Sequence, residues 1–370
     1  MIHRKLEQVI KNDFNKSKAI VVMGARQVGK TTALKHLVDS KNSLMLNCDD
    51  YDDRVGLENR TSTELRNLIG NHKVVIIDEA QRVRNIGLTL KMIVDMNLPV
   101  QILVSGSSSL SLSDEINEPA TGRLIEHEMF PLSLSELAAH TSPREEQRLL
   151  GQRMIYGMYP EVVTKPEDAR QLLVNLSNNY LYRDLLGYKG IKKPDTLQKL
   201  VRALALQVGS EVSYNELSNL VGVDKATVEN YIDLLEKCYV LFRLPSFSRN
   251  MRSEIKKGKK IYFYDNGIRN ALISNFAPLE QRNDVGVLWE NLMVSERIKR
   301  NSYTESYAQM FFWRTQQQQE IDLIEEMDGQ LTAYEFKWKR ANARLPKAFA
   351  DNYPNVQLQV VTPENYWEFV

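Results

Sequence analysis

Short runs of consecutive apolar residues alternate with helix-like segments over the first third of the chain. The runs cover residues 19–23, 43–47, 74–77 and 100–104. Continuous apolar strands are typical of a sheet that is buried on both faces, and strands that alternate with helices favour parallel strand order. The pattern therefore predicts an α/β fold with a parallel sheet in this part of the chain.

The rest of the chain has two further patterns. Residues 196–206 have helical apolar spacing, and a short helix over 217–221 is separated by Gly222 from a second helix that begins after Asp224. With strand-like runs at 239–244 and 260–264, this order predicts a winged helix-turn-helix. Residues 285–300 then predict a helix, and three later runs predict the strands of a terminal α/β domain, at 310–314, 321–324 and 331–338.

A glycine-rich motif follows the first apolar run. Residues 24–31 read G-x-x-x-x-G-K-T between that predicted strand and a helical segment. In this context the backbone N–H groups surround a phosphate, Lys30 adds a charge for the β- and γ-phosphates, and the Thr31 hydroxyl binds Mg²⁺. The sequence therefore predicts a nucleoside triphosphate site with Mg²⁺. Its nucleotide-binding residues are Gly24, Ala25, Arg26, Gln27, Val28, Gly29, Lys30, Thr31 and Thr32.

Polar residues downstream add candidate catalytic positions, and an Asp-Glu pair among them predicts hydrolysis. The third apolar run ends in Asp78-Glu79, where Asp78 is expected to bind Mg²⁺ and Glu79 to activate the attacking water. The next run ends in serines, of which Ser107 is the predicted sensor of the γ-phosphate and Ser105 the alternative. A serine-rich turn with no such role would give the same pattern. Arg123 is a candidate arginine finger, acting within the chain or across a subunit interface. A surface salt bridge is the alternative for Arg123.

Composition narrows the class of protein. A chain of 370 residues predicts two or three domains, and a formal net charge of +1 excludes a globally basic nucleic-acid coat. Cys48 and Cys238 fit no metal or redox spacing, so we expect reduced thiols. The sequence has no run of eighteen apolar residues and no signal-peptide core at its start. We therefore expect a cytoplasmic protein with no membrane partner.

The order of these motifs resembles a known group, the prokaryotic AAA-like ATPases near the STAND-type signalling ATPases. Members carry a C-terminal domain of unknown function that is similar to restriction-type PD-(D/E)XK nucleases. The matching stretches are residues 24–32, 76–81, 105–109, 121–123, 130–136, 157–160, 182–184 and 264–267. The resemblance implies ATP as the nucleotide. It also implies a P-loop ATPase core over 1–140, a helical lid over 141–192, a winged helix-turn-helix over 193–275 and a nuclease-like domain over 276–370.

The same resemblance implies an adenine contact in the lid. The turn at residues 157–160, which ends in Pro160, looks like the segment that abuts the adenine in related ATPases. Here Gly157 is followed by Met158 and Tyr159 where the family pattern has a second glycine.

Charge in the predicted winged helix is uneven. The second helix offers two lysines and three acidic residues, a poor match for a DNA groove. The wing carries six basic residues against Glu254, a net charge of +5, and predicts phosphate contacts without sequence preference. These residues are Arg249, Arg252, Lys256, Lys257, Lys259 and Lys260. A solvated hairpin, or a protein-docking module, is the alternative.

The terminal domain holds a candidate nuclease site. Strand alternation places Glu335 and Lys337 on one face, and Asp322 lies one strand earlier. The resemblance implies that the carboxylates bind Mg²⁺ while the lysine stabilises the attacked phosphate. Glu290, on the preceding helix, would add a further carboxylate. A solvent-exposed face of mixed charge would give the same pattern.

Two functions follow from these motifs. In the first, an ATP-driven enzyme acts on DNA or RNA through the winged helix and the nuclease-like domain. In the second, ATP gates a switch or scaffold that assembles as a homo-oligomer, and the terminal domain binds without cleaving. ATP hydrolysis is common to both.

Overall fold

The computed structural model describes residues 2–39, 41–106, 120–180, 194–248, 258–339 and 343–370. The chain forms two compact units. The first comprises Met1–Leu132 with Lys237–Tyr239, and the second comprises Ser133–Glu236 with Val240–Val370. No described helix is both long enough and apolar enough to cross a membrane. Cys48 and Cys238 are free and buried.

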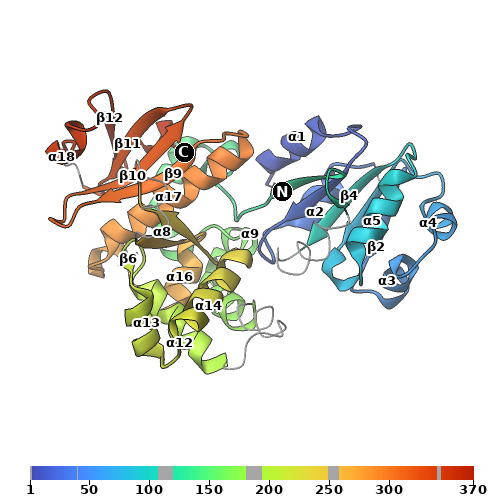
Figure 1. Ribbon diagram of the computed structural model, residues 1–370, viewed down its shortest axis with the longest axis horizontal. Coiled ribbons are helices and arrows are strands. Elements are labelled where there is room, and N and C mark those ends of the chain that lie inside the picture. The colour runs from blue at the N-terminus through green and yellow to red at the C-terminus, as the bar shows by residue number, and fades with distance from the viewer. Residues whose placement is uncertain (1, 40, 107–119, 181–193, 249–257, 340–342) are drawn as a thin grey trace. The chain divides into compact units, whose positions relative to one another are not determined.

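The first unit is built on a five-stranded parallel sheet of order β2-β3-β4-β1-β5. The strands are β1 (Ala19–Met23), β2 (Ser43–Asn47), β3 (Val74–Asp78), β4 (Gln101–Gly106) and β5 (Leu124–Glu128). The helices are α1 (Lys5–Asn12), α2 (Lys30–His36), α3 (Tyr51–Leu57), α4 (Ser62–Ile69), η1 (Ala80–Arg82) and α5 (Ile86–Asp95). The predicted parallel α/β sheet is thus confirmed (Figure 1). Its register aligns the carboxyl ends of β1, β3 and β4 at one edge.

The second unit begins with helices. These are α7 (Leu134–His140), α8 (Pro143–Tyr156), α9 (Pro160–Thr164), η2 (Pro166–Asp168), α10 (Ala169–Asn175) and η3 (Leu176–Tyr180). Three more follow, α12 (Pro194–Leu206), α13 (Tyr214–Val221) and α14 (Lys225–Lys237), and α16 (Asn266–Leu272) comes later. A small antiparallel sheet of order β6-β8-β7 is formed by β6 (Glu211–Val212), β7 (Leu241–Pro245) and β8 (Lys259–Phe263).

A long helix, α17 (Val285–Tyr303), lies along a second sheet of order β12-β11-β10-β9 (Figure 1). The strands are β9 (Gln309–Arg314), β10 (Glu320–Met327), β11 (Gln330–Phe336) and β12 (Gln357–Val361), and the short elements are η4 (Leu279–Gln281), α18 (Lys347–Ala350) and η5 (Tyr366–Glu368). Phe247, which follows β7, is buried in the core of this sheet with Phe311 and Phe349. The small sheet and the large sheet therefore share apolar packing within one unit.

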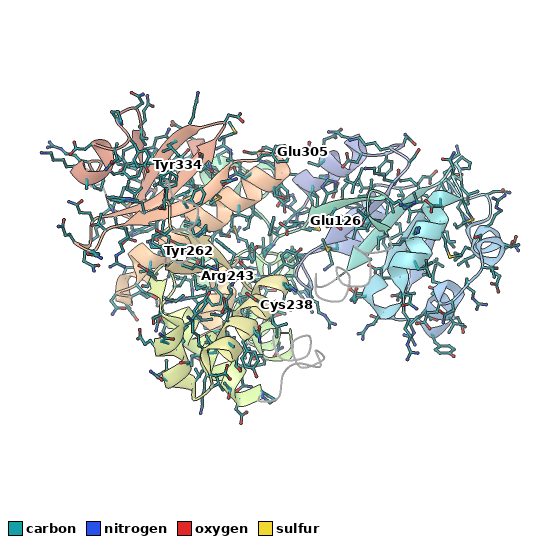
Figure 2. The ribbon with its side chains drawn as sticks, in the orientation of Figure 1. Glu126, Cys238, Arg243, Tyr262, Glu305 and Tyr334 are labelled. Atoms are coloured by element: carbon teal, nitrogen blue, oxygen red, sulfur yellow. The ribbon has the colours of Figure 1, made fainter. Side chains whose placement is uncertain are left out.

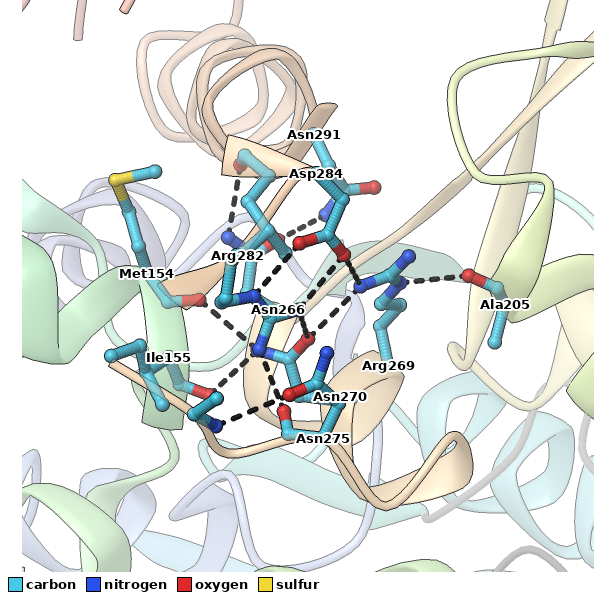
Figure 3. A network of polar contacts seen from close by, with 12 residues as sticks. Met154, Ile155, Ala205, Asn266, Arg269, Asn270, Asn275, Arg282, Asp284 and Asn291 are labelled. Carbon is cyan, nitrogen blue, oxygen red and sulfur yellow. Dashed lines mark hydrogen bonds and ion pairs between the residues drawn. The ribbon is translucent and has the colours of Figure 1, made fainter. Parts of the chain in front are cut away.

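Buried polar contacts join α8, α16 and the start of α17 (Figure 3). Asn270 donates to the carbonyl of Ile155 at 2.8 Å. Asp284 accepts from Arg269 at 2.6 Å and from Arg282 at 2.8 Å. Burial opposes ionisation of Asp284, but the hydrogen bonds from the two guanidinium groups prevail and lower its pKa to about 2.

Replacing this carboxylate should therefore cost stability in a pH-dependent way. Because the folded pKa of Asp284 lies below its ordinary value of 3.8, its stabilising effect is present above about pH 4 and is lost as the pH falls through the folded value. We expect Asp284→Asn to lower the free energy of unfolding by about 1–3 kcal/mol at pH 7. Urea unfolding at several pH values measures the loss, with the exposed Asp351→Asn as control. Equal losses near pH 7 and near pH 2 would contradict the assignment.

Candidate nucleotide site and acidic cluster

The glycine-rich loop connects β1 to α2 and depends on two glycines. Gly29, the residue before α2, has a φ of 95°, a left-handed conformation that favours glycine. At Gly24 an added Cβ would lie 2.1 Å from the carbonyl oxygen of Met129, so a side chain has no room there. The loop can therefore follow this path only with glycine at both positions.

Lys30 is held against the loop by backbone carbonyls. Its ammonium donates to the carbonyl oxygens of Gly24 at 2.9 Å and Ala25 at 2.7 Å, and the residue is 5% exposed. The N-terminus of α2 begins at the same residue, so backbone N–H groups and the lysine charge lie together. This is an anion-binding arrangement of the kind that phosphates require.

Three elements meet at the carboxylate of Asp78, at the end of β3. The hydroxyl of Thr31, in the first turn of α2, donates to its two oxygens at 2.9 and 3.0 Å. The hydroxyl of Ser105, in β4, donates to the same carboxylate. Carboxylate and hydroxyl oxygens are the donors that Mg²⁺ prefers in proteins, so Asp78 and Thr31 have the chemistry of a Mg²⁺ site.

Glu79 lies directly after Asp78 in an uncommon backbone conformation. Its φ is 54°, which is rare for a residue with a side chain and is often found at functional sites. Its N–H donates to the hydroxyl of Ser105 at 3.3 Å, and Gln81 donates to its carboxylate. Ser105 therefore contacts both acidic residues. Ser107 lies outside the described residues.

Arg123 lies at the other end of the sheet. β5 pairs with β1 in parallel, with Ala19 opposite Leu124, so the residue before β5 stands at the amino ends of the strands. The glycine-rich loop follows the carboxyl end of β1, roughly 15 Å away for a five-residue strand. Arg123 instead forms an ion pair with Asp95, Nε to Oδ1, at 2.6 Å. The prediction that Arg123 reaches the phosphates of its own chain is therefore wrong, and the salt-bridge alternative is observed.

Sequence reasoning missed Arg4, which stabilises the loop from outside. Arg4 is buried, and its guanidinium donates to the carbonyls of Val28 and Phe130, each at 2.6 Å. It thereby ties the loop to the segment that follows β5. An arginine that precedes a short helix gives no sequence signal for this contact, because the two carbonyls lie 24 and 126 residues away.

In the second unit, Pro160 is the first residue of α9, and the segment before it is fixed to α16. Gly157 has a φ of 68°, and an added Cβ would lie 2.0 Å from Oδ1 of Asp265. The other oxygen of Asp265 accepts from the N–H of Met158 at 2.7 Å. The local structure thus requires Gly157, and the adenine contact of Pro160 stays a prediction.

The fold brings together the three residues of the candidate nuclease site. The ammonium of Lys337 lies 2.6 Å from Glu335 and 3.9 Å from Asp322. Asp322, in β10, also accepts from the N–H of Phe336 at 2.8 Å. The two strands are paired antiparallel, which places Asp322 beside the end of β11.

Glu290 lies in the same neighbourhood, held by two residues of β8. Glu290 accepts from Lys260 at 3.0 Å and from the hydroxyl of Tyr262, marked in Figure 2, at 2.6 Å. Lys260 also pairs with Glu320, in β10. We call these four carboxylates and two lysines the acidic cluster: Glu290, Glu320, Asp322, Glu335, Lys260 and Lys337.

Lys260 therefore differs from the expectation. It is 1% exposed and is engaged by two carboxylates, so it is not available for the phosphate contact that the sequence predicts. Strand alternation explains why Lys260 is buried while the lysine before it is not. Successive residues of a strand face opposite sides, so Lys259 points to the other face of β8, where it is half-exposed. The other predicted wing contacts, Arg249, Arg252, Lys256 and Lys257, lie outside the described residues.

Burial dominates the electrostatics of the acidic cluster. It raises the pKa of Asp322, as does the charge of Glu335, while Lys260 opposes the shift. Burial also raises the pKa of Glu290, again against the effect of Lys260. For Lys337, burial disfavours the ammonium, but Glu335 and Asp322 prevail and raise its pKa. The cluster is a partly buried site with more acidic than basic groups, in which Lys260 and Glu335 are buried.

Comparison with known proteins places these sites in separate regions. Residues 16–138 match the AAA domain family, residues 147–279 match a domain of unknown function (DUF8612), and residues 285–366 match a second one (DUF4143). An uncharacterized protein of Mycobacterium tuberculosis is 25% identical over 89% of this chain and 72% of its own length. Another, of Methanocaldococcus jannaschii, is 25% identical over 98% of this chain and 85% of its own length. The Walker-type ATPase of Pyrococcus abyssi is similar over 73% of this chain and 93% of that chain, with a TM-score of 0.49 and 15% identity.

The class of protein follows from the first region. A parallel sheet, a glycine-rich loop before α2 and a match to the AAA domain family occur in the same residues. Residues 16–138 form a P-loop domain that matches the AAA domain family.

The contacts of Arg4 lead to a test of the loop. Arg4→Met leaves two buried carbonyls without their charged donor, and we expect the free energy of unfolding to fall by about 2–3 kcal/mol. The affinity for ATP should fall as well, because the loop loses its anchor. Thermal unfolding and nucleotide titration measure both effects, with the exposed Lys11→Met of α1 as the matched control. An unchanged affinity for ATP in a destabilised Arg4 variant would show that the anchor does not shape the nucleotide site.

Proposed function

We propose that the chain is a Mg²⁺-dependent ATP hydrolase whose site comprises Lys30, Thr31, Asp78, Glu79 and Ser105. The observation that carries this proposal is the convergence of the Thr31 and Ser105 hydroxyls on Asp78, beside Glu79 and next to the lysine of the loop. Few other functions need an ammonium group, a helix N-terminus and a carboxylate–hydroxyl pair at one sheet edge.

Each residue has a role in this proposal. The glycine-rich loop and Lys30 bind the phosphates. Thr31 and Asp78 would hold Mg²⁺, which supplies charge neutralisation to the phosphate oxygens when it is bound. Glu79 accepts a proton from the attacking water. The hydroxyl of Ser105 positions both acidic residues, because it accepts from the N–H of Glu79 and donates to the carboxylate of Asp78. A role for Arg123 remains only across a subunit interface, at a site on another copy.

Two variants separate binding from hydrolysis. Lys30→Ala should lose most ATP binding, whereas Glu79→Gln should bind ATP and hydrolyse it at least about a hundredfold more slowly, because the base is lost. Phosphate release and equilibrium binding are measured on both, with Lys35→Ala, an exposed position on α2, as the control. A Glu79→Gln variant with the wild-type rate would show that another group acts as the base.

We also propose that residues 193–275 form a winged helix that contacts nucleic-acid phosphates. Its support is the order of α12, β6, α13, α14, β7 and β8, with Gly222 turning between α13 and α14 at a φ of 72°. Two acidic residues of α14 are engaged inside this part, because Arg243 pairs with Asp233 at 2.6 Å and with Glu236 (Figure 2 marks Arg243). These pairs neutralise part of the negative charge on α14 that would repel a phosphate backbone.

The acidic cluster supports a further proposed activity, Mg²⁺-dependent cleavage of DNA or RNA. Asp322 and Glu335 offer carboxylate oxygens for the metal, and Lys337 lies beside both to stabilise charge on an attacked phosphate. The second candidate is an ATP-gated switch with a non-cleaving terminal domain. The observation that favours this switch is that Lys260 already pairs with Glu290 and Glu320, two of the four carboxylates of the cluster.

Cleavage distinguishes these candidates. With ATP and millimolar Mg²⁺ or Mn²⁺, the first candidate predicts cleavage of DNA or RNA. Asp322→Ala should abolish it by removing a ligand of the metal, and Lys337→Ala by removing the cation that stabilises charge on the attacked phosphate. Gel assays on a panel of substrates measure it, and the exposed Asp351→Ala serves as control. If the wild type cleaves none of them while its mass in light scattering changes with ATP, the switch is the better account.

A further inference from the structure

Lys260 occupies an unusual environment for a lysine. It is 1% exposed, and its ammonium lies 3.0 Å from Glu290 and also contacts Glu320. The ammonium also lies over the ring of Phe312, 5.6 Å from the ring centroid. Lysines are rarely buried to this degree unless they are paired. Both partners belong to the large sheet and its helix, whereas Lys260 belongs to β8 of the small sheet.

The charges in the acidic cluster fall into two halves, each around one lysine. We call them the outer half and the inner half because the side chain of Lys337 is 36% exposed and that of Lys260 is 1% exposed. In the outer half, Lys337 lies beside Glu335 and Asp322. In the inner half, Lys260 lies between Glu290 and Glu320, and Arg314 approaches Glu320 at 3.6 Å. Divalent cations need carboxylate oxygens at about 2.0–2.6 Å. An ammonium and a divalent ion cannot both take the same oxygens without strong repulsion.

We propose that Lys260 is the resident cation of the acidic cluster: its ammonium holds the position between Glu290 and Glu320 that a divalent metal ion would otherwise take. A metal ion binds to this inner half only when the lysine leaves. In the complete cluster, metal and lysine compete for the same carboxylates.

The competition connects the cluster to the small sheet. Lys260 and Tyr262 lie two residues apart on one face of β8, and both contact Glu290. β8 is the central strand of that sheet, paired with β6 on one side and β7 on the other. Displacing the ammonium therefore requires a shift of the Lys260 side chain or of β8 itself. Any partner that moves β8 would change the affinity of the cluster for metal, and bound metal would act back on β8 to the same extent.

The test measures metal binding on the full chain without nucleotide. Asp78→Asn is included in every protein to remove the metal ligand of the nucleotide site. Lys260→Met keeps the apolar stem and removes the charge, whereas Lys260→Arg keeps the charge. We expect the Met variant to bind Mn²⁺ at least about tenfold more tightly than the parent, since the carboxylates lose their internal cation. The Arg variant should behave as the parent does.

Two controls locate the effect. Lys259→Met, on the opposite face of β8, should leave Mn²⁺ affinity unchanged. Adding Glu320→Gln to Lys260→Met should remove the gain, because the inner half then lacks one ligand. If Lys260→Met does not fold, as judged by circular dichroism, Lys260→Gln replaces it. Terbium luminescence provides a second readout, since Tyr262 is bonded to Glu290 and would sensitise an ion bound there.

A folded, neutral Lys260 variant that binds Mn²⁺ no more tightly than the parent would overturn the proposal. The proposal rests on the proposed cleavage only for its biological consequence, and the two can fail separately. Tight Mn²⁺ binding by the variant without cleavage of any nucleic acid would reject the cleavage activity and support the proposal that Lys260 is the resident cation. Cleavage by the parent with no gain in the variant would reject only the resident lysine.

Discussion

The carboxylate of Asp78 is the point on which the ATPase domain depends. It lies at the end of β3 and accepts from hydroxyls that belong to α2 and β4. Parallel register is what allows this meeting, because it aligns the carboxyl ends of neighbouring strands at one edge. The glycine-rich loop, the helix N-terminus and Glu79 are all positioned relative to that edge. The same register places the amino ends of the strands far from the site.

The second unit relies on a different principle, the pairing of charges away from water. Asp284 joins α16 to α17 through Arg269, and Lys260 joins β8 to α17 and β10 through Glu290 and Glu320. A buried ion pair contributes little net stability compared with apolar packing, but removing one partner is costly. Such pairs specify how elements dock. They also make the docking sensitive to anything that competes for a partner, such as a metal ion at the cluster.

Much of this could be predicted from the sequence where the signal is local. The apolar runs and the glycine-rich loop predict the parallel sheet, because burial on both faces and phosphate geometry each act on consecutive residues. Strand alternation predicts that Glu335 and Lys337 share a face, and the resemblance adds Asp322 and Glu290. The fold brings these four residues together. Their chemistry remains a proposal.

The predictions that were wrong depended on distant pairing. Arg123 follows a glycine and precedes a strand, a position that fits an arginine finger or a surface salt bridge equally, and only the register of β5 on β1 decides at which edge it lies. The run of basic residues along the chain predicts that Lys260 belongs to the wing, whereas strand alternation turns it toward carboxylates 30 and 60 residues later. Arg4 escaped notice for the same reason, since its partners are two carbonyls that the fold brings near.

The most direct test of the account is calorimetric titration of the purified chain with ATP, in the presence of Mg²⁺ and again with the metal chelated. The account predicts saturable heat for a single site per chain, with clearly weaker binding when Mg²⁺ is withheld. If no purine triphosphate produces heat with Mg²⁺ present, the arrangement around Asp78 is not a nucleotide site and the account is wrong.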